Sequence, residues 1–203
     1  MTRFNEKEAF DLIITRRSTR TYQDKTVERE KLETVLEAGR YAPSGGNNQS
    51  CRFTVIRNRD VLEKLCKLVE EAFSRMEYDE NTYSSLRSSI IRSREGGYRF
   101  HYDTPTLVVI SNKRGYGNAM ADSACALENM AIMANAMDLG TCYINQLHWL
   151  DEEGLVREYL ASVGIPREET ITCALAVGYP ATSDGMPSRI PLKRNGNIIE
   201  WVD

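Results

Sequence analysis

Three arginines lie within five residues in the stretch Arg16-Arg17-Ser18-Thr19-Arg20. A guanidinium is a planar set of donors that matches a phosphate or a carboxylate, and the Ser18 hydroxyl adds a donor that can approach an anion closely. The chain carries a formal net charge of -3, so this concentration of positive charge is local. Two interpretations are open: an anion-binding site, or a solvated basic turn of the kind that most charge clusters form.

A second stretch, Ala42-Pro43-Ser44-Gly45-Gly46-Asn47-Asn48-Gln49, is a loop of small and amide residues. Its glycines permit backbone angles that other residues avoid. Its side chains offer donors and acceptors without charge, which suits the edge of a heterocycle or a sugar-like chain. It could equally be a plain turn that leads into a strand predicted at residues 52–57.

The composition is that of an ordinary globular protein. The 203 residues are 41% hydrophobic and 27% charged, which predicts one domain with a substantial core over residues 1–203. The slight negative charge argues against a surface that coats nucleic acid. No apolar run approaches the roughly 20 residues that span a bilayer, and Met1–Lys7 lacks the hydrophobic segment of a signal peptide.

Cysteine and histidine usage bears on compartment and metal binding. The cysteines, an odd number without close pairs, are Cys51, Cys66, Cys125, Cys142 and Cys173. This pattern indicates reduced thiols in a cytoplasmic protein rather than a disulfide framework. With only two histidines as imidazole ligands, the sequence predicts no metal site.

Apolar residues recur with helical periodicity in several segments. Asn5, Thr26 and Asn58 are the expected N-caps of the first three helices. The segment 118–139 is apolar on nearly all faces, which predicts a helix buried in the domain or against a second subunit. Gly140 is expected to end that helix as a C-cap. The predicted helices lie around residues 9–14 and over residues 26–40, 59–76, 118–139 and 151–163.

Short apolar runs predict strands at residues 52–57, 107–111, 141–144 and 171–177. A last apolar run, Ile198 to Val202, is expected to be a strand that must pair and bury somewhere, plausibly on a partner subunit. Residues 77–100 are polar and expected to be weakly helical at best, as a mobile cover or an interface element. The order of elements predicts a layered α+β or α/β domain.

Four residues before Pro105 could wall a pocket for a flat substrate or belong to the core, and the core is favoured for most of them: Tyr98, Phe100, His101 and Tyr102. Histidine is the usual proton carrier near neutral pH, but His101 is interpreted as a packed or a surface histidine rather than as a catalytic base.

The arginine stretch, the Pro43–Gln49 loop, the long apolar helix, Gly178-Tyr179-Pro180 and Arg189-Ile190-Pro191 together resemble the nitroreductase family of FMN-dependent NAD(P)H oxidoreductases. The resemblance covers nearly the whole chain. It departs from the family after Gln49, where Ser50-Cys51 replaces the usual proline–tryptophan. It implies a three-layer α+β fold with a central, mostly antiparallel sheet flanked by helices. It also implies a homodimer whose C-terminal strand joins the partner's sheet, with FMN at the interface.

The resemblance implies roles for individual residues of the arginine stretch. Arg16 and Ser18, with Arg189 from the tail, would hold the FMN phosphate. Arg20 would lie near the N1 and O2 edge of the flavin, where it would stabilise the reduced form. Arg17 would bond the ribityl chain or face the partner subunit.

Two further segments are implied to border the flavin ring. One is the loop that the partner subunit offers, and the other is a strand end with a backbone N–H near the flavin N5, at Asn145 or Gln146. No side chain is implied to be catalytic. The residues are Pro43, Ser44, Gly45, Asn47 and Gln49 in the loop, and Tyr143, Ile144, Asn145 and Gln146 at the strand end.

The implied activity is transfer of a hydride from NAD(P)H, through FMN, to an electron-poor acceptor of the nitroaromatic or quinone type in a ping-pong reaction. Members of the family also act on enones, halogenated phenols and thiazoline or oxazoline rings. The alternatives are a flavin-binding or flavin-storing protein without significant turnover, and a structural dimer whose arginines are at the surface. The motifs distinguish neither NADH from NADPH nor one acceptor from another.

Overall fold

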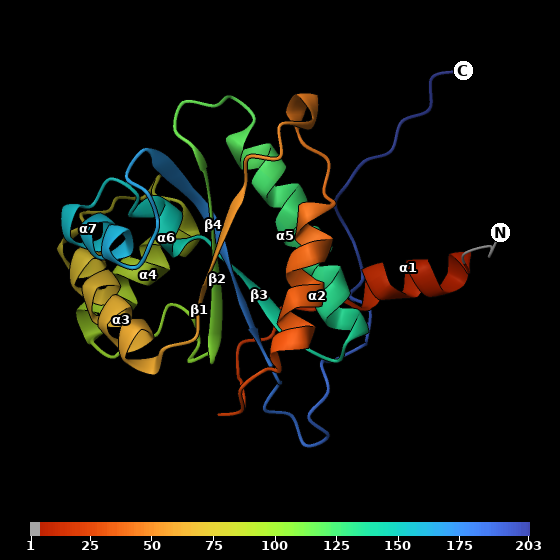
Figure 1. The fold of residues 1–203 in the computed structure, drawn as a ribbon, viewed down its shortest axis with the longest axis horizontal. Coiled ribbons are helices and arrows are strands. Elements are labelled where there is room, and N and C mark those ends of the chain that lie inside the picture. The colour runs from red at the N-terminus through yellow and green to blue at the C-terminus, as the bar shows by residue number, and fades with distance from the viewer. Residues whose placement is uncertain (1–4) are drawn as a thin grey trace.

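A four-stranded antiparallel sheet lies between two layers of helices (Figure 1). The structure, a computed structural model, describes residues 5–203. The strands are β1 (Arg52–Ile56), β2 (Thr106–Lys113), β3 (Gly140–Ile144) and β4 (Glu169–Gly178), in the order β1-β2-β4-β3. Every neighbouring pair is antiparallel. The predicted α+β fold with a central antiparallel sheet is therefore confirmed.

The helices divide between the two faces of the sheet (Figure 1). On one face α2 (Arg29–Arg40) packs against α5 (Ala119–Ala136), and α1 (Glu6–Thr15) projects from the body beside them. The other face carries α3 (Arg59–Arg75), α4 (Ser84–Glu95), the short α6 (Gln146–Trp149) and α7 (Gly154–Ser162). A 3-10 turn, η1 (Gly45–Asn47), lies within the Pro43–Gln49 loop.

The central strands are apolar on both faces because a helical layer covers each face. Successive side chains of a strand point to opposite sides. Along β2, Leu107 and Val109 belong to the core beneath α3 and α7, whereas Val108 and Ile110 belong to the core beneath α2 and α5. A continuous apolar run, not an alternating one, therefore marks these strands in the sequence.

Two predicted helix starts differ in outcome. Asn58 accepts hydrogen bonds from the Asp60 and Val61 backbone nitrogens at 2.9 and 3.1 Å, so this N-cap is confirmed. The Thr26 cap is wrong, because α2 begins at Arg29 after Glu28, and no side chain caps it. Val27 is fully buried, and burial of this side chain keeps the chain extended past Thr26.

Gly140 does not cap a helix as predicted. Helix α5 ends at Ala136, and Asp138 takes the left-handed turn conformation with φ 61°. Gly140 is instead the first residue of β3. A Cβ atom there would lie 2.5 Å from Thr19 Oγ1 and 2.8 Å from its Cβ, so glycine allows the arginine segment to approach the strand.

The predicted helix over residues 151–163 begins later, at Gly154, with Glu153 as its N-cap. Asp151 is not a surface residue of a first turn. It is buried, and its carboxylate accepts from the Ile171 backbone nitrogen at 2.9 Å and from the Thr170 hydroxyl at 2.7 Å. Arg114 also donates to it at 3.0 Å. Asp151 therefore joins the start of α7 to β4.

The prediction of weak helicity for residues 77–100 is wrong, because Ser84–Glu95 form α4. Ile90 is fully buried against the core, and Arg94 donates to the Ser74 and Met76 carbonyl oxygens at the end of α3. Tertiary contacts of this kind stabilise helices whose own sequence signal is weak.

Helix α5 is apolar on all faces in the sequence but is not buried on all faces in the chain. Met120 is 43% exposed, and Ala121, Ala124 and Cys125 are also exposed. The segment 198–202 forms no strand in the described chain; it is extended, and its end lies clear of the body (Figure 1). Its predicted pairing with a partner stays a prediction.

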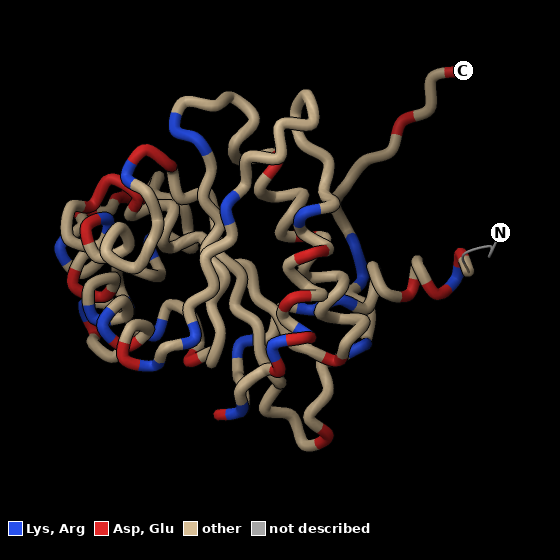
Figure 2. The backbone as a smooth tube through the Cα atoms, in the orientation of Figure 1, with Lys and Arg blue, Asp and Glu red and all other residues tan. Residues whose placement is uncertain are grey.

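Charged residues of both signs are interspersed over the outer helices α3, α4 and α7 (Figure 2). Within residues 5–203, no helix combines the length and the apolar character that crossing a membrane requires.

Candidate functional site

The arginine segment runs along the free edge of β3. Ser18 pairs with Thr141 in a parallel bridge, and the Thr19 backbone nitrogen donates to the Thr141 carbonyl oxygen at 2.8 Å. A further bridge joins Tyr22 to Pro180, just after β4. The sheet edge thus fixes the backbone from which Arg16, Arg17 and Arg20 project.

Three of the four candidate arginines contact the second half of α5, the turn after it or the tail. Arg16 donates to Glu128 of α5 at 3.1 Å, and Arg17 donates to the Ile190 carbonyl oxygen at 2.8 Å. Arg189 donates to the Asn135 carbonyl oxygen at 2.8 Å and pairs with Asp138. These four guanidiniums meet only two carboxylates within the described residues, so the cluster carries an excess of positive charge.

Arg20 differs from the other members because its neighbours are aromatic. Its guanidinium carbon lies 5.9 Å from the centre of the Tyr102 ring, and the interaction with the Tyr102 side chain raises the pKa of Arg20. Tyr102 adopts a left-handed conformation with φ 58°. Burial raises the pKa of the nearby Cys142 thiol, so this thiol stays protonated and leaves the Arg20 charge uncompensated.

The Pro43–Gln49 loop is held at the first turn of α5. The Gly45 backbone nitrogen donates to Asp122 Oδ1 at 3.1 Å, and the Tyr116 hydroxyl donates to the Gly45 carbonyl oxygen at 3.2 Å. A Cβ atom at Gly45 would lie 2.2 Å from the Asn118 side chain, so a larger residue would have to displace that side chain. The loop is therefore held in place by specific contacts with α5 and Tyr116 and is more than a turn into β1.

The candidate side chains of the loop line a small cavity. The Gln49 backbone nitrogen donates to Ser44 Oγ at 3.0 Å, and Asn47 and Gln49 adopt left-handed conformations with φ 54° and 49°. A pocket of about 180 Å³ is bordered by Pro43, Ser44 and Gln49, together with Asp122. Asn47 does not line this pocket and stays a separate candidate.

The side chains at the strand end, Tyr143 to Gln146, differ in their exposure to solvent. Tyr143 is 43% exposed, whereas Ile144 is 1% exposed, so only the backbone of Ile144 could meet a ligand. The Asn145 backbone nitrogen donates to Gln146 Oε1 at 3.1 Å. Gln146 Nε2 in turn donates to the Tyr98 hydroxyl at 2.9 Å, which orients the amide.

One chain does not bring the arginine cluster and the loop together. The loop contacts Asp122 in the first turn of α5, whereas Arg189 contacts Asn135 in its last turn. At a rise of 1.5 Å per residue these two positions are about 20 Å apart along the helix. The exposed apolar face of α5, which includes Met120 and Cys125, lies along the same helix.

Two residues that fix the loop, Asp122 and Tyr116, are not predicted from the sequence. An acidic residue in the first turn of an otherwise apolar helix is the one local signal that could have identified Asp122, and Tyr116 carries no such signal. Tyr98 and Tyr102 border Gln146 and Arg20. The sequence names both as core or pocket wall, but their contacts with these two residues depend on the fold.

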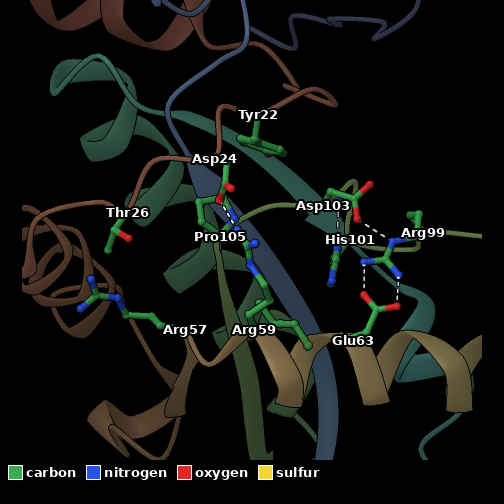
Figure 3. Close-up of a pocket in the computed structure, with 11 residues that line it drawn as sticks. Tyr22, Asp24, Thr26, Arg57, Arg59, Glu63, Arg99, His101, Asp103 and Pro105 are labelled. Atoms are coloured by element: carbon green, nitrogen blue, oxygen red, sulfur yellow. Dashed lines mark hydrogen bonds and ion pairs between the residues drawn. The ribbon is translucent and has the colours of Figure 1, made fainter.

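The cavity around His101 is separate from all these candidates (Figure 3). It measures about 420 Å³, and its rim carries the ion pair of Arg59 with Asp24 and that of Arg99 with Glu63. Arg99 also reaches Asp103 at 2.5 Å (Figure 3). None of the fourteen candidate residues named above lines it.

Of the two predicted interpretations of His101, packed or at the surface, the structure confirms the packed one. His101 is 1% exposed; its Nδ1 accepts from the Asp103 backbone nitrogen at 3.0 Å, and its Nε2 lies 3.4 Å from Cys66 Sγ. Burial lowers the pKa of His101 to about 4. The imidazole is therefore neutral at physiological pH. Tyr98 and Phe100 are also buried, as the sequence analysis favours.

Comparison with known proteins identifies the family. The nitroreductase family model matches residues 13–179. A nitroreductase from Bacteroides fragilis, solved with bound FMN, is 33% identical, with a TM-score of 0.81 over 98% of this chain and 100% of its own. One from Desulfitobacterium hafniense with bound FMN is 24% identical, with a TM-score of 0.77 over 98% and 100% of the two chains.

A curated relative agrees with these structures. The 4-nitrobenzoate reductase of Nocardioides sp. is 28% identical over 228 residues, which cover 97% of this chain and 88% of the relative. The match of the family model over most of the chain, the fold and the 33% identity all agree with the sequence motifs. This chain belongs to the nitroreductase family.

Proposed function

We propose that this protein is an FMN-dependent oxidoreductase that uses NAD(P)H to reduce an electron-poor acceptor of the nitroaromatic or quinone type. The reaction is of the ping-pong kind: NAD(P)H gives up its hydride and leaves before the acceptor enters the same place. The observation that carries the proposal is the arginine cluster on the β3 edge, where four guanidiniums meet two carboxylates. FMN, when bound, carries the hydride and the electrons between the two substrates.

The donor set of this chain fits FMN. A phosphate monoester carries a charge of about −1.5 to −2 at neutral pH, which matches the excess positive charge of the cluster. Arg16, Ser18 and Arg189 would hold the phosphate, and Arg17 would bond the ribityl chain or face the partner. Hydrogen bonds to charged groups contribute about 1.5–3 kcal/mol each, so two or three of them would contribute roughly 3–9 kcal/mol to cofactor binding.

The other candidates would border the ring. Arg20 has no carboxylate partner in the described chain, so its charge is free to stabilise negative charge at the N1 edge. A backbone N–H at Asn145 or Gln146 would lie near N5. The Asn145 N–H donates to Gln146 Oε1, so it would exchange this partner for the cofactor. Pro43, Ser44, Gly45, Asn47 and Gln49 would come from the second subunit.

A homodimer would bring the two halves of the site together. The loop and the arginine cluster lie along different parts of α5. In a dimer, each chain would therefore give its arginine cluster to one flavin site and its loop to the other. Apolar surface on the same side of the chain supports this arrangement. Phe10 and Ile13 of α1 are exposed, as are Met120 of α5 and Trp201 of the tail. Exposed apolar patches of this extent mark association surfaces.

Purified protein should be yellow and should release FMN when denatured. NADH or NADPH should bleach the bound flavin in a stopped-flow experiment, and a quinone or a nitroaromatic should restore the colour. A colourless protein that neither binds added FMN nor oxidises NAD(P)H would overturn the proposal. Bound flavin that saturating NAD(P)H reduces only slowly would support the storage alternative.

Arg20→Ala should lower the two-electron midpoint potential of the bound flavin by about 30–60 mV. Loss of a charge-assisted contact of about 1.5–3 kcal/mol corresponds to that shift, since 30 mV is about 1.4 kcal/mol for two electrons. Affinity for oxidised FMN should change less, because the N1 charge develops on reduction. Redox titration and fluorescence titration measure the two effects.

Arg17→Ala is the matched control, because it removes a guanidinium from the same segment that is bonded to the Ile190 carbonyl. It should leave the potential near that of the wild type. An unchanged potential in Arg20→Ala would remove the role assigned to Arg20 while leaving the cofactor assignment intact.

A further inference from the structure

A second cavity adjoins the strand end proposed for the flavin ring. It measures about 220 Å³ and is lined by four serines of α4, by Arg92 of the same helix, and by Tyr98, Tyr102 and Gln146. We call it the serine pocket. Drug-sized ligands occupy pockets of roughly 300–1,000 Å³, so the serine pocket suits a smaller group, such as one end of a single substituted ring.

The chemistry of the serine pocket favours an anion. Residues four apart lie on one face of a helix, so Ser84, Ser88 and Arg92 form one polar row along it. No acidic residue of the described chain lines the pocket, and Arg92 is the one charged residue that does. Hydroxyl and guanidinium donors together match the oxygens of a carboxylate.

Arg92 is free to bind such a group. Within residues 5–203 it forms no ion pair, whereas Arg94, two residues on, is bonded to the Ser74 and Met76 carbonyl oxygens and pairs with Glu77. The Arg92 guanidinium lies 5.3 Å from the centre of the Tyr98 ring. This cation–π contact orients the charge without neutralising it.

The serine pocket is joined to both candidate contacts of the flavin ring. Gln146 Nε2 donates to the Tyr98 hydroxyl at 2.9 Å, and that hydroxyl lies 2.9 Å from Ser89 Oγ. Tyr102, which lines the pocket, packs against Arg20. A ligand whose anionic end lies beside Arg92 is therefore next to Gln146, a residue assigned to the flavin, and to Tyr102, the neighbour of Arg20.

We propose that the serine pocket binds the carboxylate of an aromatic acceptor, with Arg92 as its charge partner. This inference rests on the proposed function and names the substrate class: an electron-poor arene that carries a carboxylate. The serine hydroxyls and the Tyr98–Gln146 pair would orient the carboxylate, while the reducible substituent on the far side of the ring meets the cofactor.

The test compares an anionic acceptor with a neutral one of the same shape. 4-Nitrobenzoate and 4-nitrobenzamide have nearly the same shape, but the amide is neutral and replaces one carboxylate oxygen with an NH2 donor. Arg92→Gln should lower the ratio of kcat/KM for the benzoate over the benzamide about tenfold, as expected for one charge-assisted contact. The wild-type preference should also weaken at high salt, because Arg92 is exposed to screening. Arg92→Lys, which keeps the charge, should restore part of the ratio.

Arg87→Gln is the control, because it removes the same charge from α4 outside the pocket and should keep the wild-type ratio. Titration calorimetry with benzoate, which cannot be reduced, supplies a readout that does not depend on turnover; Arg92→Gln should bind it about tenfold more weakly. This binding persists even if the protein fails to oxidise NAD(P)H, so failure of the proposed function is distinguishable.

Two results would overturn the inference. One is an unchanged benzoate affinity and an unchanged ratio in Arg92→Gln, which would mean that the pocket is occupied by solvent alone. The other is a loss confined to reduction of the flavin by NADH or NADPH, which would assign the charge of Arg92 to a phosphate of the dinucleotide instead.

Discussion

A chain that lacks residues 195–203 should be a monomer with little bound FMN, whereas the full chain should be a yellow dimer. In the single chain Ile198, Ile199, Trp201 and Val202 are each at least three-quarters exposed. Burying one large apolar side chain contributes roughly 1.5–3 kcal/mol, so the loss of four would remove a large part of the association energy. Light scattering coupled to size exclusion, with flavin absorbance recorded on the same run, measures both outcomes.

Point variants separate the apolar contacts from the length of the tail. Ile198→Ser, Ile199→Ser and Trp201→Ser together should mimic the deletion, whereas Glu200→Gln in the same segment should leave mass and flavin content unchanged. All variants keep Ile190, whose carbonyl oxygen anchors Arg17. A truncated chain that remains dimeric and fully loaded with FMN would exclude the tail from the interface.

Helices and strands could be predicted from the sequence where several local features, such as a capping residue and apolar periodicity, indicate the same element. For α3, an N-cap at Asn58 and a periodic apolar stripe coincide, and the observed bounds Arg59–Arg75 lie within one residue of the predicted ones. Strands β2 and β4 were recognisable because both of their faces are buried, which leaves continuous apolar runs. Cap chemistry and periodicity are local properties, so one sequence suffices to read them.

Elements that depend on distant contacts could not be predicted. Helix α4 offers few apolar side chains, and its stability comes from Ile90 in the core and from the bonds of Arg94 to the end of α3. From the sequence, Asp151 is expected in the first turn of a helix. In the structure its carboxylate instead accepts hydrogen bonds from Thr170 and Ile171 of β4. From the sequence, Gly140 is expected to be a helix cap. In the structure it begins β3, and Thr19 packs against it.

The candidate site also has parts that the sequence predicts and parts that only the fold determines. The arginine stretch and the Pro43–Gln49 loop are visible as motifs, since their residue types are unusual in any context. Their separation along α5 is a property of the fold, because the loop is bonded to Asp122 in the first turn, whereas Arg16 of the stretch meets Glu128 in the second half of the helix. The sequence does not identify Arg92 as a binding residue, because the segment 77–100 around it is expected to be weakly helical at best.

Acid should destabilise this protein through His101, and His101→Asn should remove most of that sensitivity. In the folded state the pKa of His101 is about 4, below the ordinary 6.5, because the imidazole is buried. The unfolded chain therefore binds a proton more readily between these values, so the free energy of unfolding falls as the pH drops from 6.5 toward 4. A difference of 2.5 pKa units corresponds to about 3 kcal/mol at the acid end, and to about 2 kcal/mol at pH 5.

Asparagine suits the substitution, because its side-chain oxygen can accept from the Asp103 backbone nitrogen as His101 Nδ1 does, and it does not titrate. Urea unfolding at pH 7 and pH 5 should show a smaller loss of stability in His101→Asn than in the wild type. His148→Asn removes the other histidine and should keep the wild-type acid sensitivity. Equal pH dependence in all three proteins would contradict the assignment.

The same variant separates a packed histidine from a catalytic one. Loss of a general base slows a reaction roughly 10²–10⁴-fold, whereas His101→Asn should reduce its flavin with NADH at nearly the wild-type rate. The cavity that His101 lines carries none of the candidate flavin residues, and the buried imidazole is bonded to the Asp103 backbone nitrogen and contacts Cys66. A rate that falls a hundredfold with stability intact at pH 7 would instead extend the active site to this cavity.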